Sequence, residues 1–351
     1  MSAMLDDLDR RLLNLVQAQV PLVERPFEAL AAQLGTSQED IIGRLTRLRS
    51  PPRPVIRQIS AIFDSQALGY RSTLVAAKLH PALIERAAAV VNLHPGVSHN
   101  YQRNHEYNLW YTLAVGPDSR LGLEGTVDVL HCQSGAMATR MLPTLRLFKI
   151  GVKLDLSGEG DPAAQSESPA FTQDQRDRAG GSPLTDGDKR MIRVLQQDLP
   201  MLARPFDAWA AQAGVGVADL LAAAGAFLQQ RRMRRFSAVL RHREAGFSAN
   251  AMGIWIVPPD RIEAFGRKAA TFSAVSHCYH RPTYADWPYS VFTMVHGQSP
   301  ADCEAVLKAI AEATGFGEYS ALYSSREFKK VRVKYFTGDI EAWEAAAQAS
   351  T

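Results

Sequence analysis

The chain is a tandem repeat, and this feature constrains its fold more than any other. Arg25-Pro26-Phe27 recurs as Arg204-Pro205-Phe206, 179 positions later. Val97-Ser98-His99 recurs as Val275-Ser276-His277, 178 positions later. Matches at a nearly constant offset along most of the chain indicate two copies of one unit. The copies have diverged, so we expect an intramolecular pseudo-dimer with an asymmetric site. Further association of this pseudo-dimer into a homo-oligomer is compatible with the sequence.

Apolar spacing and capping residues predict the elements of each copy. The first half reads as helices over 5–18, 26–35 and 38–49, with equivalents at 206–213 and 217–230 in the second half. Strands at 55–63 and 72–79 then precede a helix at 82–92, a long β segment at 97–115, a helix at 121–135 and a closing strand at 148–154. This order predicts an α+β chain: a tandem repeat of a winged helix-turn-helix followed by a ferredoxin-like (βαββαβ) domain.

Domain boundaries follow from this pattern and from one change in composition. We expect helix-turn-helix domains at 1–60 and 184–236 and ferredoxin-like domains at 61–156 and 237–340. Residues 157–183 are rich in Gly, Ser, Pro and charge, which predicts a flexible linker.

Charge and cysteine usage exclude several classes of protein. The chain carries 39 basic and 36 acidic residues, a balance that argues against a general nucleic-acid binder. Its three cysteines show no paired spacing, so we expect no disulfide framework and no metal site. No apolar run approaches the roughly 20 residues that span a bilayer, and the charged N-terminus is not a signal peptide. These features predict a cytoplasmic protein without a membrane partner.

The helix-turn-helix motifs are poor candidates for DNA recognition. A recognition helix should present polar and basic side chains to base edges and phosphates. The second-half equivalent, residues 217–230, is almost entirely apolar, and the first, 38–49, begins with two acids. We therefore predict that these helices pack against protein and that DNA is not a partner.

Three segments carry a resemblance to a known family. They are His99-Asn100-Tyr101-Gln102-Arg103-Asn104-His105-Glu106-Tyr107-Asn108-Leu109-Trp110, the segment from His277 through Trp287 to Gly297, and the segment from Arg234 to Phe247. Together with the repeated architecture, which is that of Lrp/AsnC regulators, they resemble the siroheme decarboxylases, with both subunit types fused in one chain. The resemblance implies removal of the C12 and C18 acetate carboxyls of siroheme, giving 12,18-didecarboxysiroheme and CO2 for haem d1 or alternative haem synthesis.

The same segments hold the candidate site residues. A flat apolar macrocycle rimmed by carboxylates needs aromatic walls and arginines that bind carboxylates through two hydrogen bonds. The candidates for substrate binding are Tyr101, Arg103, Trp110, Arg234, Arg235, Arg241, Tyr279, Arg281, Trp287 and His296. Arg234, Arg235 and Arg241 could instead belong to a solvated basic strand.

Decarboxylation also needs an electron sink and a proton for the new methyl group. The conjugated macrocycle can act as the sink, so we expect no cofactor beyond the iron that siroheme itself carries. Histidine fits the role of general acid near neutral pH. His105 is the first candidate, followed by the equivalent pair His99 and His277. Strand periodicity predicts that His99, Tyr101, Arg103 and His105 share one face.

Two other functions remain open on the sequence alone. One is a haem- or tetrapyrrole-sensing Lrp/AsnC-type transcriptional regulator, for which sequence-specific, salt-sensitive DNA binding would be the evidence. The other is a tetrapyrrole carrier, which would bind the macrocycle without changing its mass.

Overall fold

The computed structural model describes residues 5–52, 54–150, 183–240 and 249–349. The chain divides into two compact units, and each unit takes one domain from each repeat. The first unit contains residues up to Leu68 together with 183–240 and 334–337, and the second contains most of the remainder. Apart from Pro183, the linker predicted at 157–183 lies outside the described residues.

The first unit contains the two helix-turn-helix motifs. Its helices are α1 (Asp7–Ala18), α2 (Pro26–Leu34), α3 (Gln38–Arg49), α7 (Asp186–Leu195), α8 (Asp207–Ala213) and α9 (Val217–Gln229). Local sequence sets their ends. Asp6 caps α1 by accepting from Asp9 N–H at 2.7 Å, and Gly35, at φ +72°, ends α2 in the left-handed region that favours glycine. The helix bounds predicted from the sequence are correct to within two residues.

Two strands join the motifs inside the first unit. β1 (Ile56–Phe63) pairs antiparallel with β7 (Met233–Leu240), and Ser60 lies opposite Ser237. The two copies also share one core. Phe63 of the first copy meets Phe227 of the second edge-on at 6.0 Å between ring centroids. The motifs therefore form one folded body with a core common to both repeats.

The second unit contains both ferredoxin-like domains. The first copy has β2 (Arg71–Lys78), α4 (Ile84–Leu93), β3 (Val97–Arg103), β4 (Leu109–Val115), α5 (Gly122–Ser134), β5 (Ala138–Leu142) and β6 (Arg146–Ile150). The second copy has β8 (Ala249–Trp255), α10 (Ile262–Ala270), β9 (Val275–His280), β10 (Val291–Gly297), α11 (Pro300–Thr314), β11 (Tyr319–Lys330) and α12 (Asp339–Ala349).

The last strand of each repeat crosses to the other repeat. The nine strands are ordered β5-β2-β4-β3-β11-β8-β10-β9-β6. The first part of β11 pairs with β8 of its own copy, and the second part, from Ser324, pairs with β3 of the first copy. In the first copy β5 pairs with β2, whereas β6 pairs with β9 of the second copy. The single closing strand predicted at 148–154 is therefore wrong: β5 closes the domain, β6 crosses over, and residues 151–154 are not described.

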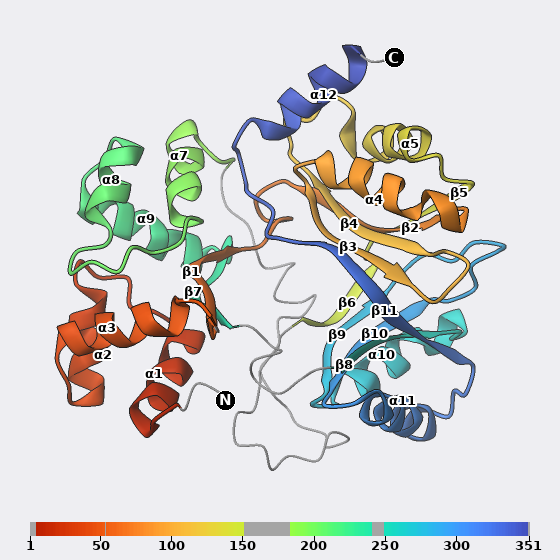
Figure 1. Cartoon of the computed structure of the whole chain (residues 1–351), viewed down its shortest axis with the longest axis horizontal. Coiled ribbons are helices and arrows are strands. Elements are labelled where there is room, and N and C mark those ends of the chain that lie inside the picture. The colour runs from red at the N-terminus through yellow and green to blue at the C-terminus, as the bar shows by residue number, and fades with distance from the viewer. Residues whose placement is uncertain (1–4, 53, 151–182, 241–248, 350–351) are drawn as a thin grey trace. The chain divides into compact units, whose positions relative to one another are not determined.

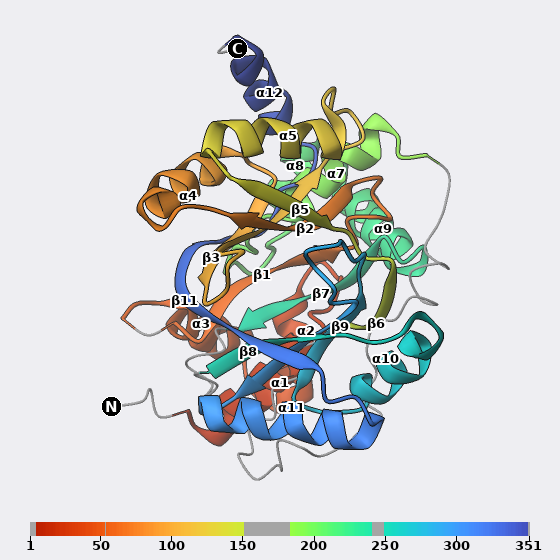
Figure 2. The same ribbon diagram turned by 90° about the vertical axis from the view of Figure 1, so that its right-hand side faces the viewer.

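The nine strands form two halves joined by β11, which are called the two sheets below: β5-β2-β4-β3 and β8-β10-β9-β6. Helices cover the outer faces of the sheets, and the inner faces pack on each other (Figures 1 and 2). α4 and α5 lie on one side and α10 and α11 on the other. The exchanged strands contribute to these cores: Phe148 of β6 belongs to the core with α10 and α11, and Phe328 of β11 packs on the core with α4 and α5. Gly266 of α10 lets the Phe148 ring approach, because a Cβ there would lie 2.3 Å from that ring. A third core lies between the sheets.

Taken singly, no helix of the described residues is both long enough and apolar enough to span a membrane. The pair α8 and α9 meets both criteria together, with a bend of 87° at the break between them.

Candidate functional site

Aromatic side chains from both repeats meet in the core between the sheets. Trp287, which precedes β10, is fully buried, and its ring lies 5.3 Å from Trp110 of β4 and 5.6 Å from Tyr107, measured between centroids. Trp110 donates its indole N–H to the backbone oxygen of Tyr107 at 2.6 Å. Trp110 and Trp287, both predicted to contact substrate, thus lie in contact in one cluster.

His105 lies beside this cluster in the turn between β3 and β4. Its ring meets Trp287 edge-on at 5.2 Å, and its Nδ1 accepts from Tyr107 N–H at 3.0 Å. The neutral ring therefore carries its proton on Nε2. Burial lowers the pKa of His105 below its usual value. The prediction that His105 continues the face of the strand is wrong, because β3 ends at Arg103 and the chain turns there.

A charged network links the His105 turn to the second repeat. Tyr107 donates its hydroxyl to Asp286 at 2.6 Å, and Arg140 of β5 binds both oxygens of Asp286 at 2.8 and 3.0 Å. Hydrogen bonds from Arg140 and then Tyr107 lower the pKa of Asp286 to about 2. Sequence reasoning missed Arg140 and Asp286. The only available signal was the position of Asp286 beside Trp287, because Arg140 is distant in sequence.

Two equivalent rows of side chains lie on β3 and β9. His99 and Tyr101 have centroids 6.1 Å apart, and His277 and Tyr279 have centroids 6.0 Å apart at nearly the same tilt. Tyr101 pairs across the sheet with Trp110, and Tyr279 pairs with Phe292. Cross-strand partners share a face, so both rows lie on the faces turned toward the core between the sheets. The structure therefore brings the predicted residues of both copies onto these inner faces.

Each row ends in a buried arginine. Arg103 donates to the backbone oxygen of Leu322 at 3.0 Å, and Arg281 donates to that of Leu142. Both guanidinium groups lie over the tyrosine of their own row, at 5.8 Å for Arg103 and 4.8 Å for Arg281. Burial lowers the pKa of each to about 10. Each Nε has no hydrogen-bond partner among the described residues.

Serine hydroxyls hold the row histidines. Ser98 Oγ lies 2.9 Å from His99 Nδ1, and Ser276 Oγ lies 2.8 Å from His277 Nδ1. In the second copy Ser276 Oγ also lies 2.7 Å from Nε2 of His296 on β10. His296, predicted as a substrate contact, is therefore joined to the His277 row through one hydroxyl. The sequence did not identify the serines as orienting groups.

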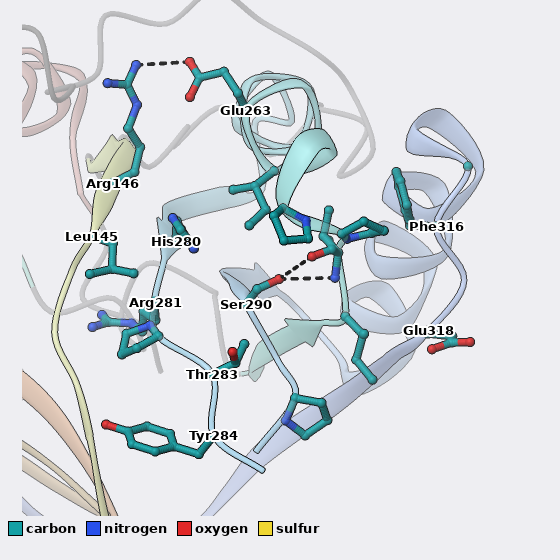
Figure 3. A pocket seen from close by; sticks show the side chains of 18 of the residues that line it. Leu145, Arg146, Glu263, His280, Arg281, Thr283, Tyr284, Ser290, Phe316 and Glu318 are labelled. Carbon is teal, nitrogen blue, oxygen red and sulfur yellow. Dashed lines mark hydrogen bonds and ion pairs between the residues drawn. The ribbon is translucent and has the colours of Figure 1, made fainter. Parts of the chain in front are cut away.

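A pocket of about 980 Å³ opens beside the end of β9 (Figure 3). Its lining includes His280 and Arg281, together with Arg146 of β6, which donates to Glu263 at 3.0 Å. Ser290 fixes one wall through hydrogen bonds with Val257 N and O. Burial lowers the pKa of His280. The volume lies at the upper end of the range for small-molecule sites.

The remaining predicted residues lie in the first unit or outside the described residues. Arg234 and Arg235 lie on β7, where Arg234 Nε is 3.7 Å from the buried carboxylate of Asp64. Arg241 is not described. Among the described residues no group of three or more His, Cys, Asp or Glu side chains has a geometry that could hold a metal ion.

Family models match both repeats of the chain. A model of the AsnC-like ligand binding domain matches residues 67–149 and 244–329, and a model of the siroheme decarboxylase NirDL-like HTH domain matches residues 9–57 and 188–234. A siroheme decarboxylase from Hydrogenobacter thermophilus is 38% identical to this chain, over 95% of this chain and 96% of that protein. The chain belongs to the siroheme decarboxylase family.

Membership of the siroheme decarboxylase family agrees with two further comparisons. The solved structure of the siroheme decarboxylase NirDL in co-complex with an iron-uroporphyrin III analogue has a TM-score of 0.76 and 32% identity, covering 98% of this chain and 99% of that one. A siroheme decarboxylase beta subunit from Methanosarcina barkeri is 41% identical over 42% of this chain and 97% of its own length. The family resemblance and the repeated fold class predicted from the sequence are thus confirmed.

Proposed function

We propose that this chain is a carboxy-lyase that removes carboxyl groups from siroheme as CO2. The observation that carries the proposal is the pair of equivalent His–Tyr–Arg rows, His99 to Arg103 and His277 to Arg281, within a member of the siroheme decarboxylase family. A substrate with two equivalent acetates suits a protein with two equivalent rows. We further propose that the carboxyls removed are the C12 and C18 acetates, giving 12,18-didecarboxysiroheme for haem d1 or alternative haem synthesis.

The reaction places three demands on the protein. It must orient the macrocycle, keep the departing carboxylate ionised, and deliver a proton to the carbon that CO2 leaves. The macrocycle itself accepts the electron pair of the broken bond, so no cofactor is needed beyond the iron that belongs to the substrate. The work left to the side chains is therefore binding and proton transfer.

Histidines are the proposed proton donors. His105, His99 and His277 remain the candidates, and each is anchored through Nδ1, by Tyr107 N–H, Ser98 and Ser276 respectively. A fixed Nδ1 leaves Nε2 as the atom that can face a substrate. The lowered pKa of His105 makes its imidazolium a stronger acid but a less populated one near neutral pH.

Substrate binding is proposed for the remaining predicted residues. Tyr101 and Tyr279 are half-buried, so they are placed to form aromatic walls, whereas Trp110 and Trp287 support the inner face from within the core. The arginines proposed to bind the carboxylates of siroheme are Arg103, Arg281, Arg234, Arg235 and Arg241, with His296 as a further contact. Arg140, with a side chain 28% exposed, joins this set on the basis of its position beside Tyr107.

We propose that DNA is not a partner and that the enzyme works in the cytoplasm. Arg44 of the first recognition helix is bound to Asp6, Asp9 and Asp40, and Arg47 is bound to Asp9. Basic side chains held in ion pairs within the protein are withdrawn from phosphate contacts. A salt-sensitive, sequence-specific gel shift would contradict this part of the proposal.

The identity of the acetates that lose their carboxyl groups is tested by determining the structure of the product. The purified protein is incubated anaerobically with siroheme, and the tetrapyrrole is analysed by NMR for new methyl groups. Methyl groups at C12 and C18 are expected, and methyl groups elsewhere on the ring would overturn the assignment. The variants His105→Ala, His99→Ala and His277→Ala are compared in the same assay, with loss of about 100-fold or more expected for a true proton donor.

A further inference from the structure

One serine in the second repeat connects two histidines. Ser276 Oγ lies 2.8 Å from His277 Nδ1 and 2.7 Å from His296 Nε2, and it also lies 3.3 Å from the backbone oxygen of Met294. Ser276 is buried, at 4% exposure, so water does not freely replace these contacts. The two imidazoles are thus joined through a single hydroxyl.

A β-bulge produces this arrangement. The pairing of β9 with β10 shifts between Met294 and Val295, so that Ser276 is the extra residue on β9. Bulges redirect side chains and occur often beside active sites. The first repeat has the same shift between Val97 and His99, which makes Ser98 its extra residue. The bulge is therefore common to both copies.

The two copies differ in what the serine can reach on the neighbouring strand. Met294 pairs with His277 and Thr112 pairs with His99, so His296 of the second copy corresponds to Ala114 of the first. An alanine offers no side-chain nitrogen to Ser98. Only the second copy can therefore connect a second histidine at this position.

The hydrogen bonds of Ser276 with His277 and His296 form a path for protons. A serine hydroxyl has one hydrogen to donate and accepts through its lone pairs. Three groups surround Ser276 Oγ: the two imidazole nitrogens and the backbone oxygen of Met294. The hydroxyl can donate to only one of them, and the backbone oxygen cannot donate. At least one imidazole must therefore donate its N–H to Ser276 Oγ. A shift of both hydrogens along the chain then carries a proton from one imidazole to the other.

We propose that Ser276 and His296 supply a proton to His277 Nδ1 as His277 Nε2 protonates the substrate carbon. The inference rests on the proposed function. In each cycle the bond between the acetate methylene and its carboxylate breaks, CO2 leaves, and the electron pair remains on the methylene carbon in conjugation with the macrocycle. His277 Nε2 gives its proton to that carbon to form the methyl group, and in the same step His277 Nδ1 takes a proton from Ser276 Oγ, which takes one from the protonated His296. His277 Nε2 then takes a proton from solvent, and the hydrogens shift back from His277 Nδ1 through Ser276 Oγ to His296, which restores the starting state. No oxidant or reductant is consumed.

Ser276 acts through His277, so its removal should slow turnover without weakening binding. We expect Ser276→Ala and His296→Ala to lower the rate of decarboxylation about 10-fold or more, a fraction of what a full general acid contributes. Binding of iron-uroporphyrin III, followed by its absorbance, should change less than about twofold in Ser276→Ala and also reports that each variant is folded. Ser276→Thr, which keeps the hydroxyl, should recover most of the rate.

Two readouts separate proton transfer from mere orientation of His277. Imidazole added to His296→Ala should restore the rate in proportion to its concentration, because it can replace the missing donor. In equal mixtures of H2O and D2O, the ratio of hydrogen to deuterium in the new methyl group should change in Ser276→Ala and not in Ser276→Thr. Ser98→Ala is the matched control, since it removes a hydroxyl that orients one histidine only, and its rate should not respond to imidazole.

The outcomes distinguish this inference from the proposed function. If the wild-type protein leaves the mass of siroheme unchanged, the proposed function fails. If the wild type turns over and His296→Ala does so at the same rate, or is slow but unaffected by imidazole, the relay is wrong and the proposed function stands.

Discussion

Arg103 and Arg281 occupy equivalent positions in the two repeats, and each donates a hydrogen bond to a backbone oxygen of the other repeat. The acceptors are Leu322 and Leu142, which lie on β11 and at the end of β5. β11 itself crosses to the first repeat, and β5 directly precedes β6, the strand that crosses to the second. The two arginines therefore stabilise the strand exchange at both of its crossing points.

This relationship predicts matched losses of stability. Arg103→Lys and Arg281→Lys should each lower the free energy of unfolding by about 1–3 kcal/mol, because a lysine cannot reproduce the geometry of the guanidinium and a buried carbonyl loses its partner. Urea denaturation measures the effect. Arg71→Lys, in an exposed ion pair with Glu124, is the control and should cost no more than about 0.5 kcal/mol. A loss confined to one of the two arginines would contradict their equivalence.

The two core tryptophans should respond differently to the loss of the indole N–H. Trp110 donates to Tyr107 O, whereas Nε1 of Trp287 has no hydrogen-bond partner among the described residues. Trp110→Phe loses packing and a hydrogen bond, and Trp287→Phe loses packing but removes an unsatisfied donor. We expect Trp110→Phe to be the more destabilising by about 1 kcal/mol in urea denaturation. Equal losses would indicate that Trp287 has a partner in solution.

Asp286 should matter for activity through the His105 turn. Asp286→Asn weakens the bidentate contact with Arg140 and so loosens the link between Tyr107 and the second repeat. We expect the rate of siroheme decarboxylation to fall several-fold. Glu124→Gln removes a more exposed ion pair, with Arg71, far from this turn and should leave the rate unchanged. An unaffected rate in Asp286→Asn would separate the network from the reaction.

His94 should make stability depend on pH. It is fully buried against Trp343 of α12, and burial, with a smaller contribution from Lys329, lowers its pKa from 6.5 to about 4. The folded state keeps His94 neutral while the unfolded state takes up a proton below pH 6.5, so stability is complete above pH 6.5 and is lost as the pH falls toward 4. The loss should reach about 3 kcal/mol. Urea midpoints across this range should fall more steeply for the wild type than for His94→Asn; parallel curves would contradict the assignment.

Local patterns were enough to predict most of the elements. The helix at 38–49 was correct to the residue, because Ser37 caps its start and apolar residues recur at helical spacing. The repeat itself predicted two equivalent histidines, and His99 and His277 do occupy equivalent positions. These features depend on neighbours in sequence, which a single sequence displays.

Features that depend on distant partners were missed. The crossing of β6 to the second copy is decided by pairing with β9, which nothing between residues 138 and 150 reveals. The network around Asp286 joins residues from three separate loops and strands, so its members could not be grouped from spacing. Alternation along the strand predicts the face of His105 only where the strand continues, and β3 ends at Arg103, where the chain turns.

The most direct test of the central claim is the mass of siroheme after anaerobic incubation with the purified protein. Removal of carboxyl groups predicts tetrapyrrole products lighter by one and then by two CO2 units, with the CO2 released in matching amount. Tight binding of siroheme, seen by absorbance, without any change in its mass would contradict the claim and identify the protein as a tetrapyrrole carrier or sensor.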